Sequence, residues 1–189
     1  YQIEKERVGS YQIEVLAKSK EHEVPITLRF QELRDEQMQP AHGELPFFLQ
    51  ENTVIQFLQY PYEQVVAENF VEILEKMELI NDLSCYEEIY GILKKEALDG
   101  RKVEQQIIEI GTKRELFFGK DRLDTVLHYK DYTYMKRKWT AYLKRERKKE
   151  PDWVEVMTLL EAFFPPVWRA IIRDEIFIGD WMPELCRFL

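Results

Sequence analysis

Two apolar stripes at helical spacing, separated by only a few residues, constrain the fold of this chain more than any other feature. The stripes are Val66, Phe70, Ile73 and Met77, followed by Tyr86, Ile89, Tyr90 and Leu93. Pro61 precedes the first stripe and suits the first turn of a helix. Asn81 and Asp82 between the stripes are typical turn and cap residues. The pattern predicts two antiparallel helices that bury their stripes against each other or against a third layer.

Before Pro61 the apolar residues alternate with polar ones, a period that is typical of half-buried strands. The alternation is clearest at residues 11–15 and 26–30, which are joined by a polar stretch, and it predicts an antiparallel hairpin. A third strand is predicted at 53–58, and the polar segment 31–46 is expected to be a loop.

After residue 95 the helical period continues. Short helices are predicted at 101–110 and near 123–127, with a longer one from 132 to 143. Gly100 is interpreted as a helix stop. A last long helix is expected to begin at Pro151 and to end at Pro165 and Pro166, because a residue before proline disfavours helix.

Strands followed by helices indicate the α+β class, with a small antiparallel sheet leading into a helical bundle. The expected division is into strands at 1–60 and a helical domain packed on them at 61–189. At 189 residues, with 45% hydrophobic and 33% charged residues, the chain is long enough for a proper core.

The net charge of −8 argues against a surface built throughout for nucleic acid, although a local basic patch remains compatible with it. Cys85 and Cys186 show no pairing pattern, which favours a reducing cytoplasm. No apolar run reaches membrane-spanning length, so no membrane partner is expected. Because the chain begins with Tyr1 rather than Met, we expect a processed or truncated product.

Two segments carry a resemblance to a known family. The sequence PYEQVVAENF at 61–70, followed by SCYEEIYGILKK at 84–95, resembles the C-terminal half of the AbiEii/AbiGii toxin-family nucleotidyltransferases. The similarity continues to about Trp168 through WTAYL at 139–143 and PDWVEVMTLLEAFFPPVW at 151–168. It therefore covers most of the chain.

The resemblance implies transfer of a nucleotidyl group from an NTP to an acceptor such as tRNA or another RNA, with Mg²⁺ as cofactor. It also implies a toxin or phage-defence role with an antitoxin protein as partner. The family's G-[GS] turn and D-x-[DE] pair hold phosphates and metal. Gly9 and Ser10 are not followed by such a pair, and by the resemblance the two motifs would fall before Tyr1. Two explanations stay open: a truncated chain, or a family member that never had the motifs.

The family's most specific residues are altered in the matched segments. Its phosphate-contacting helix lysine corresponds to Asn69, which lacks a cationic head. Its R-D-x-Y-D-L motif corresponds to residues 84–89, so that Cys85 and Glu88 stand at the two aspartate positions. Glu88 is the candidate catalytic residue, and Glu68 and Asn69 are the candidate nucleotide-binding residues. The substitutions predict an impaired or inactive enzyme. For Glu68 and Glu88, the alternative is an ordinary solvated carboxylate on a helix surface.

A basic run is the other notable feature. Lys144, Arg145, Lys148 and Lys149 are the candidate nucleic-acid-binding residues. Against this stands the usual role of a charge run as a solvated face, and the nearby Trp139 is spaced for the core. The three histidines have no metal-ligand spacing, and no metal-binding residue is proposed. Two alternatives to the enzyme therefore stay open: a non-catalytic interaction module, and an RNA-binding helical domain.

Overall fold

The computed structural model describes residues 2–7, 10–19, 22–31, 40–46 and 53–189. The chain divides into two compact units, Tyr1–Gln39 and Pro40–Leu189. The division thus falls between residues 39 and 40, whereas the change of hydrophobic period lies near residue 60. The hairpin before residue 60 accordingly belongs to the unit that contains the helices.

The first unit is a three-stranded antiparallel sheet of β1 (Gln2–Arg7), β2 (Ser10–Ser19) and β3 (His22–Gln31), in the order β1-β2-β3. Val15 lies opposite Ile26 in the register of β2 and β3. The predicted hairpin is therefore confirmed, and its alternating apolar residues share one face of the sheet. The first strand was not among the predicted elements.

The second unit begins with a hairpin of β4 (Ala41–Pro46) and β5 (Val54–Gln59). The strand predicted at 53–58 is confirmed, but the loop predicted at 31–46 is wrong where β4 forms. Gly43 lies opposite Phe57 in this pairing, and a Cβ at position 43 would lie 2.6 Å from the Phe57 ring, so a larger residue would require that ring to move. Residues 32–39 of the predicted loop lie outside the described part of the chain.

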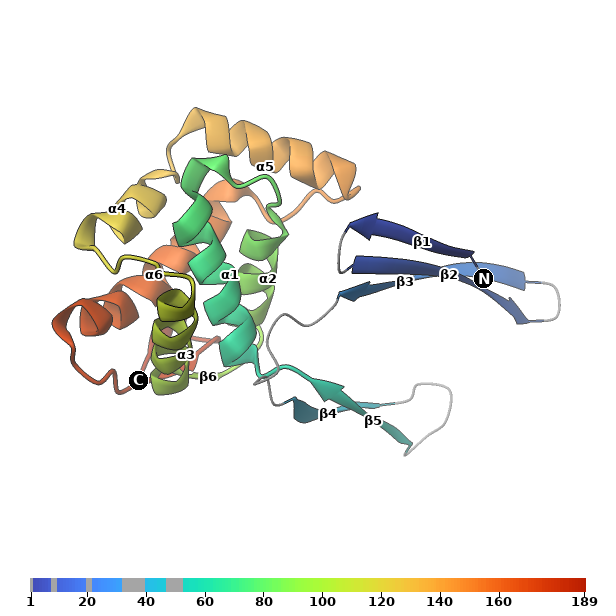
Figure 1. Cartoon of the computed structure of the whole chain (residues 1–189), viewed down its shortest axis with the longest axis horizontal. Helices are drawn as coiled ribbons and strands as arrows, with labels where there is room; N and C mark the ends of the chain where they lie inside the picture. The colour runs from blue at the N-terminus through green and yellow to red at the C-terminus, as the bar shows by residue number, and fades with distance from the viewer. Residues whose placement is uncertain (1, 8–9, 20–21, 32–39, 47–52) are drawn as a thin grey trace. The chain divides into compact units, whose positions relative to one another are not determined.

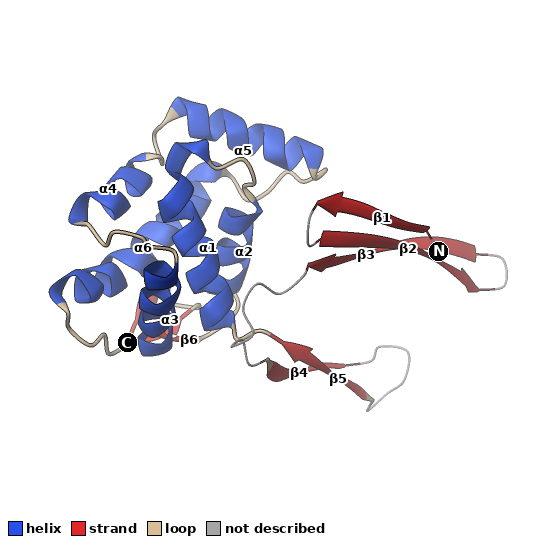
Figure 2. Ribbon diagram, in the orientation of Figure 1, coloured by secondary structure: helices blue, strands red, loops and turns tan. Residues whose placement is uncertain are grey.

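Helices make up most of the second unit (Figures 1 and 2). In chain order they are α1 (Tyr62–Lys76), α2 (Ser84–Leu93), α3 (Gly100–Lys113), α4 (Lys120–His128), α5 (Thr133–Arg145) and α6 (Trp153–Arg173), with a 3₁₀ turn, η1 (Met77–Leu79), after α1. The α+β class, with antiparallel strands preceding a helical bundle, is confirmed. Among the described residues, no helix combines the length and apolar character needed to cross a bilayer.

The core lies where α1, α2 and α6 meet. Val66, Phe70 and Ile73 of the first predicted stripe are fully buried, as is most of the second stripe. Phe70 of α1 stacks on Phe164 of α6 with ring centroids 3.6 Å apart, and Trp168 meets the same ring edge-on. Burial of these stripes is the main force that holds the helices together.

Helix α6 corrects the prediction that Pro165 and Pro166 end the last long helix, because it runs through both prolines to Arg173. Each proline removes one backbone N–H, which leaves the carbonyls of Glu161 and Ala162 without their usual donors. Both residues are exposed, so water can satisfy these carbonyls. Val167, one residue further, is buried and keeps the helix against the core.

A small C-terminal sheet closes the unit, and it was not predicted. It consists of β6 (Leu98–Asp99), β7 (Asp180–Met182) and β8 (Arg187–Phe188), in the order β6-β7-β8. Gly100 is the first residue of α3, not a helix stop. A Cβ there would lie 2.5 Å from the carbonyl oxygen of Gly179, so the close approach of the C-terminal segment requires glycine.

Candidate functional site

The candidate residues Asn69 and Glu88 lie side by side between α1 and α2. The side-chain amide Nδ2 of Asn69 donates a hydrogen bond of 2.8 Å to Oε2 of Glu88. Packing of the two buried stripes brings the helices together, so residues that flank the stripes meet across the helix interface. The sequence-predicted neighbourhood of Asn69 and Glu88 is therefore present in the structure.

Cys85 and Glu68 are arranged differently from this pair. Cys85 is buried, and its Sγ contacts the carbonyl oxygen of Asp82 at 3.4 Å. Burial raises the pKa of the Cys85 thiol, so this side chain supplies neither a carboxylate nor a thiolate at neutral pH. Glu68 precedes Asn69 on α1 and is half-buried, and it takes part in an interaction within the chain.

The chemistry open to the Asn69–Glu88 pair is limited. Glu88 is an exposed carboxylate that can accept further hydrogen bonds. Its partner is a neutral amide, which contributes no positive charge for a phosphate. Within the described ranges, no group of three or more His, Cys, Asp or Glu side chains is placed to hold a metal ion.

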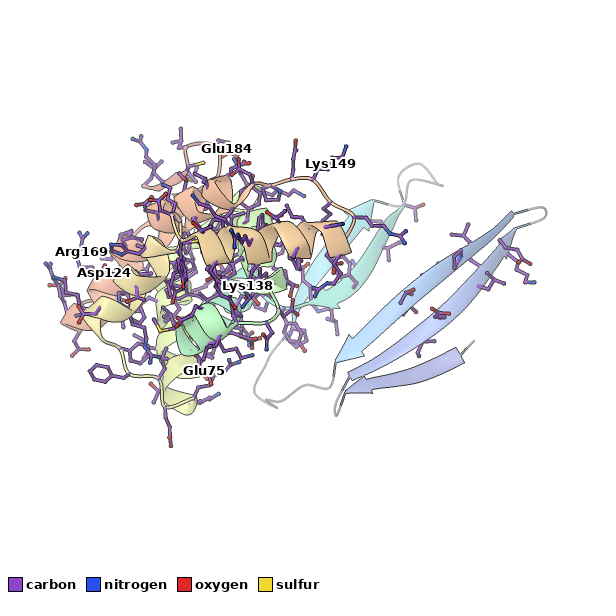
Figure 3. All side chains as sticks on the ribbon, turned by 90° about the horizontal axis from the view of Figure 1, so that it is seen from above. Glu75, Asp124, Lys138, Lys149, Arg169 and Glu184 are labelled. Atoms are coloured by element: carbon purple, nitrogen blue, oxygen red, sulfur yellow. The ribbon has the colours of Figure 1, made fainter. Side chains whose placement is uncertain are left out.

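The basic run borders an open groove between α5, the segment 146–152 and the first turn of α6. The groove has a volume of about 560 Å³. Lys144, Lys148 and Lys149 of the predicted set line it, together with Lys136. Figure 3 labels Lys149 in the segment that follows α5, with its side chain extended from the backbone.

The fourth predicted basic residue, Arg145, is not among the lining residues. Its Nε lies 3.0 Å from Oε1 of Glu146, and its guanidinium stands 5.3 Å from the centroid of the Tyr142 ring. Lys148 is also partly neutralised, because its Nζ lies 2.6 Å from Oε1 of Glu87. Lys144 and Lys149 form no ion pair with the part of the chain that the structure describes.

Sequence reasoning missed two acidic residues of this region. Glu87 accepts hydrogen bonds from both Lys148 and the hydroxyl of Tyr142, which fixes α2 against α5. Asp152 caps α6, with Oδ1 accepting from the backbone N–H of Glu155 at 2.8 Å. A Pro-Asp pair before an apolar run is a recognisable helix start, so the cap could have been predicted from the residues, whereas the cross-helix role of Glu87 could not.

Comparison with known proteins adds no relative to this geometry: no protein-family description, curated protein or solved structure matches the chain.

Proposed function

We propose that this chain is a relative of the AbiEii/AbiGii-family nucleotidyltransferases whose catalytic capacity is impaired. The parent reaction would move a nucleotidyl group from an NTP to an RNA acceptor with Mg²⁺, in a toxin or phage-defence setting with an antitoxin partner. A reducing cytoplasm is the proposed location, in keeping with Cys85 and Cys186, which are free thiols.

The observation that carries the proposal is the contact between Asn69 and Glu88. These positions correspond to a lysine and an aspartate in the family motifs, and side chains that share a nucleotide must lie close together. Their separation of 2.8 Å meets that requirement. The same contact supports the loss of function, because a neutral amide there replaces the charge-assisted contact that a lysine would give to a phosphate.

The burial of Cys85 supports the loss independently. An aspartate at this position would have to be accommodated 5% exposed at the start of α2, where a charged carboxylate needs partners. The thiol of Cys85 instead donates a hydrogen bond to the carbonyl oxygen of Asp82. The surroundings of position 85 are thus adapted to a small, weakly polar side chain.

The test is nucleotidyl transfer by the full-length gene product, once the sequence upstream of Tyr1 is shown to encode the G-[GS] turn and the D-x-[DE] pair. The protein is incubated with labelled NTPs, Mg²⁺ and bulk RNA. We expect no label on RNA from the unaltered protein. Asn69→Lys combined with Cys85→Asp is expected to raise incorporation roughly tenfold or more above background, because the lysine returns a cation to the transferring phosphate and the aspartate returns the carboxylate of the family motif. The matched control is Asn69→Gln with Cys85→Ser, which restores no charge.

Robust incorporation by the unaltered chain, abolished by Glu88→Gln, would contradict the proposed impairment. If neither the unaltered protein nor the variant with Asn69→Lys and Cys85→Asp transfers label, the resemblance no longer supports a nucleotidyltransferase origin. The alternative of a non-catalytic interaction module then stands.

A further inference from the structure

The groove at the α5–α6 connection is not used by the proposed function, which concerns α1 and α2. Its cations are arranged along a path. Lys136 and Lys144 are eight residues apart on α5, which separates them by about 12 Å along the helix axis.

Lys148 and Lys149 line the groove from the segment that follows α5. This segment folds back along the helix, because the backbone N–H of Lys148 donates to the carbonyl oxygen of Leu143 and the indole N–H of Trp139 donates to that of Pro151. An extended row of ammonium groups matches a chain of negative charges better than a single small anion.

The balance of charge in the groove is strongly positive. Among the residues that the structure describes, four lysines line it against one carboxylate, that of Asp152, which is engaged in capping α6. The N-terminus of α6 also opens here. A helix of this length presents a partial positive charge at its first turn, which adds to the attraction for anions. The chain as a whole carries a net charge of −8, so this groove differs in sign from the molecule around it.

The floor of the groove is apolar. Trp139, Leu143, Trp153 and Val154 contribute to it. The two indole N–H groups do not serve a ligand, because that of Trp139 donates to the carbonyl oxygen of Pro151 and that of Trp153 to the carbonyl oxygen of Tyr129. The floor therefore offers hydrophobic contact without directional hydrogen bonds.

We propose that this groove binds single-stranded nucleic acid without sequence preference, with phosphates on the lysines and bases against the apolar floor. Cationic grooves with apolar or aromatic floors are the usual solution for unpaired strands, because every base has an apolar face. Lysine acts as a point charge on phosphate, and phosphate contacts carry no sequence information, which fits binding without sequence preference. The groove volume of about 560 Å³ lies within the usual range for a ligand cleft, so it has room for a base.

An acidic peptide is the competing ligand, and the groove favours it less. A bound peptide presents backbone N–H and C=O groups that need partners. Within the described part of the chain, the lining supplies only Thr140 and the engaged Asp152 as polar groups besides lysine. A peptide backbone would therefore lose hydrogen bonds with water and regain few of them.

The test is a titration of the full chain with a fluorescein-labelled oligouridine of about 12 nucleotides, followed by fluorescence anisotropy at several salt concentrations. Three lysines that each neutralise one phosphate predict a slope of about −2 for log K against log salt. Lys144→Glu with Lys149→Glu is expected to weaken binding roughly tenfold or more and to flatten the slope. Both residues are exposed, so the fold is not at risk.

Two further variants make the assignment specific. Arg101→Glu with Lys102→Glu makes the same change of charge at the first turn of α3, where glutamate is favourable, and it should leave binding unchanged. Val154→Asp introduces a carboxylate into the groove at an exposed position near the start of α6, and it should weaken binding as the lysine reversals do.

The proposal is overturned if the lysine reversals bind oligouridine as tightly as the unaltered chain, or if both reversal pairs weaken binding equally. It is also overturned if a duplex of the same length, or polyaspartate, competes as well as the single strand. Quenching of tryptophan fluorescence by oligouridine in the unaltered chain, absent in Val154→Asp, would support the floor contact.

Discussion

Single tyrosine hydroxyls join elements that are distant in the sequence. Tyr129, after α4, donates to Oε2 of Glu78 in η1 at 2.6 Å. Tyr142 likewise ties α5 to α2 through Glu87, and Tyr90 ties α2 to α6 through Glu155. For all three tyrosines, burial and the neighbouring glutamate raise the pKa of the phenol. These contacts are therefore sensitive to alkaline pH.

Tyr129→Phe tests this coupling. Because the folded-state pKa of Tyr129 is raised above its ordinary value, the Tyr129 contribution to stability is complete below about pH 10 and is lost as the pH rises above it. The variant should be less stable at neutral pH and should lose less stability between neutral and alkaline pH. Urea unfolding midpoints at a series of pH values measure this difference.

The stability of the same two proteins at acid pH tests the other partner of this hydrogen bond, Glu78. The hydrogen bond from Tyr129 lowers the pKa of Glu78 below 4.5, so the Glu78 contribution is present above that pH and is lost as the pH falls. Tyr129→Phe should therefore also lose less stability than the unaltered protein as the pH falls into the acid range. Unfolding curves of the two proteins that run parallel across both pH ranges would show that the hydrogen bond contributes nothing.

At the scale of elements, hydrophobic period identified long segments and missed short ones. The stripes of α1 and α2 extend over several turns, so their period could be read from the residues alone. Strands β6 and β8 have two residues each, which is too short to show alternation. The passage of α6 through Pro165 and Pro166 depends on tertiary burial that no local rule contains.

The C-terminal sheet is part of the core, and Trp181 of β7 shows this best. Its side chain is fully buried, and its indole N–H donates to the carbonyl oxygen of Leu93 at the end of α2, at 2.8 Å. Trp181→Phe removes the donor and leaves a buried carbonyl unbonded. We expect a loss of about 1–3 kcal/mol in the free energy of unfolding, measured by chemical denaturation.

Leu185→Ala is the matched control for Trp181, because Leu185 belongs to the same C-terminal segment but is 51% exposed. Its substitution should change the unfolding free energy by less than about 0.5 kcal/mol. Equal effects of the two substitutions would mean that the segment is not anchored through Trp181.

At the scale of the whole molecule, the order of strands and helices along the chain was easier to predict than the assignment of each element to one of the two units. Strands before helices could be read from the change of period at Pro61. The assignment of β4 and β5 to the helical unit could not, because it depends on contacts that form only in the folded chain. The meeting of Asn69 and Glu88 followed from the two stripes, since helices that bury adjacent stripes must bring their flanks together.

The lysine-lined groove at the α5–α6 connection could not be predicted from the composition of the chain. A net charge of −8 suggests a surface that repels nucleic acid, yet charge is distributed unevenly over the folded chain. Lys136 and Lys148 line one groove because the segment that follows α5 turns back into α6. Their common groove is therefore a property of the fold, and the sequence shows only that lysines are frequent there.

The proposed loss of a cation beside Glu88 is tested most directly by isothermal titration of the full chain with Mg²⁺-NTP, before and after Asn69→Lys. We predict a dissociation constant weaker than about 1 mM for the unaltered chain and about tenfold tighter binding for Asn69→Lys, with no gain for Asn69→Gln. Micromolar binding by the unaltered chain that Asn69→Lys leaves unchanged or weakens would contradict the proposed impairment.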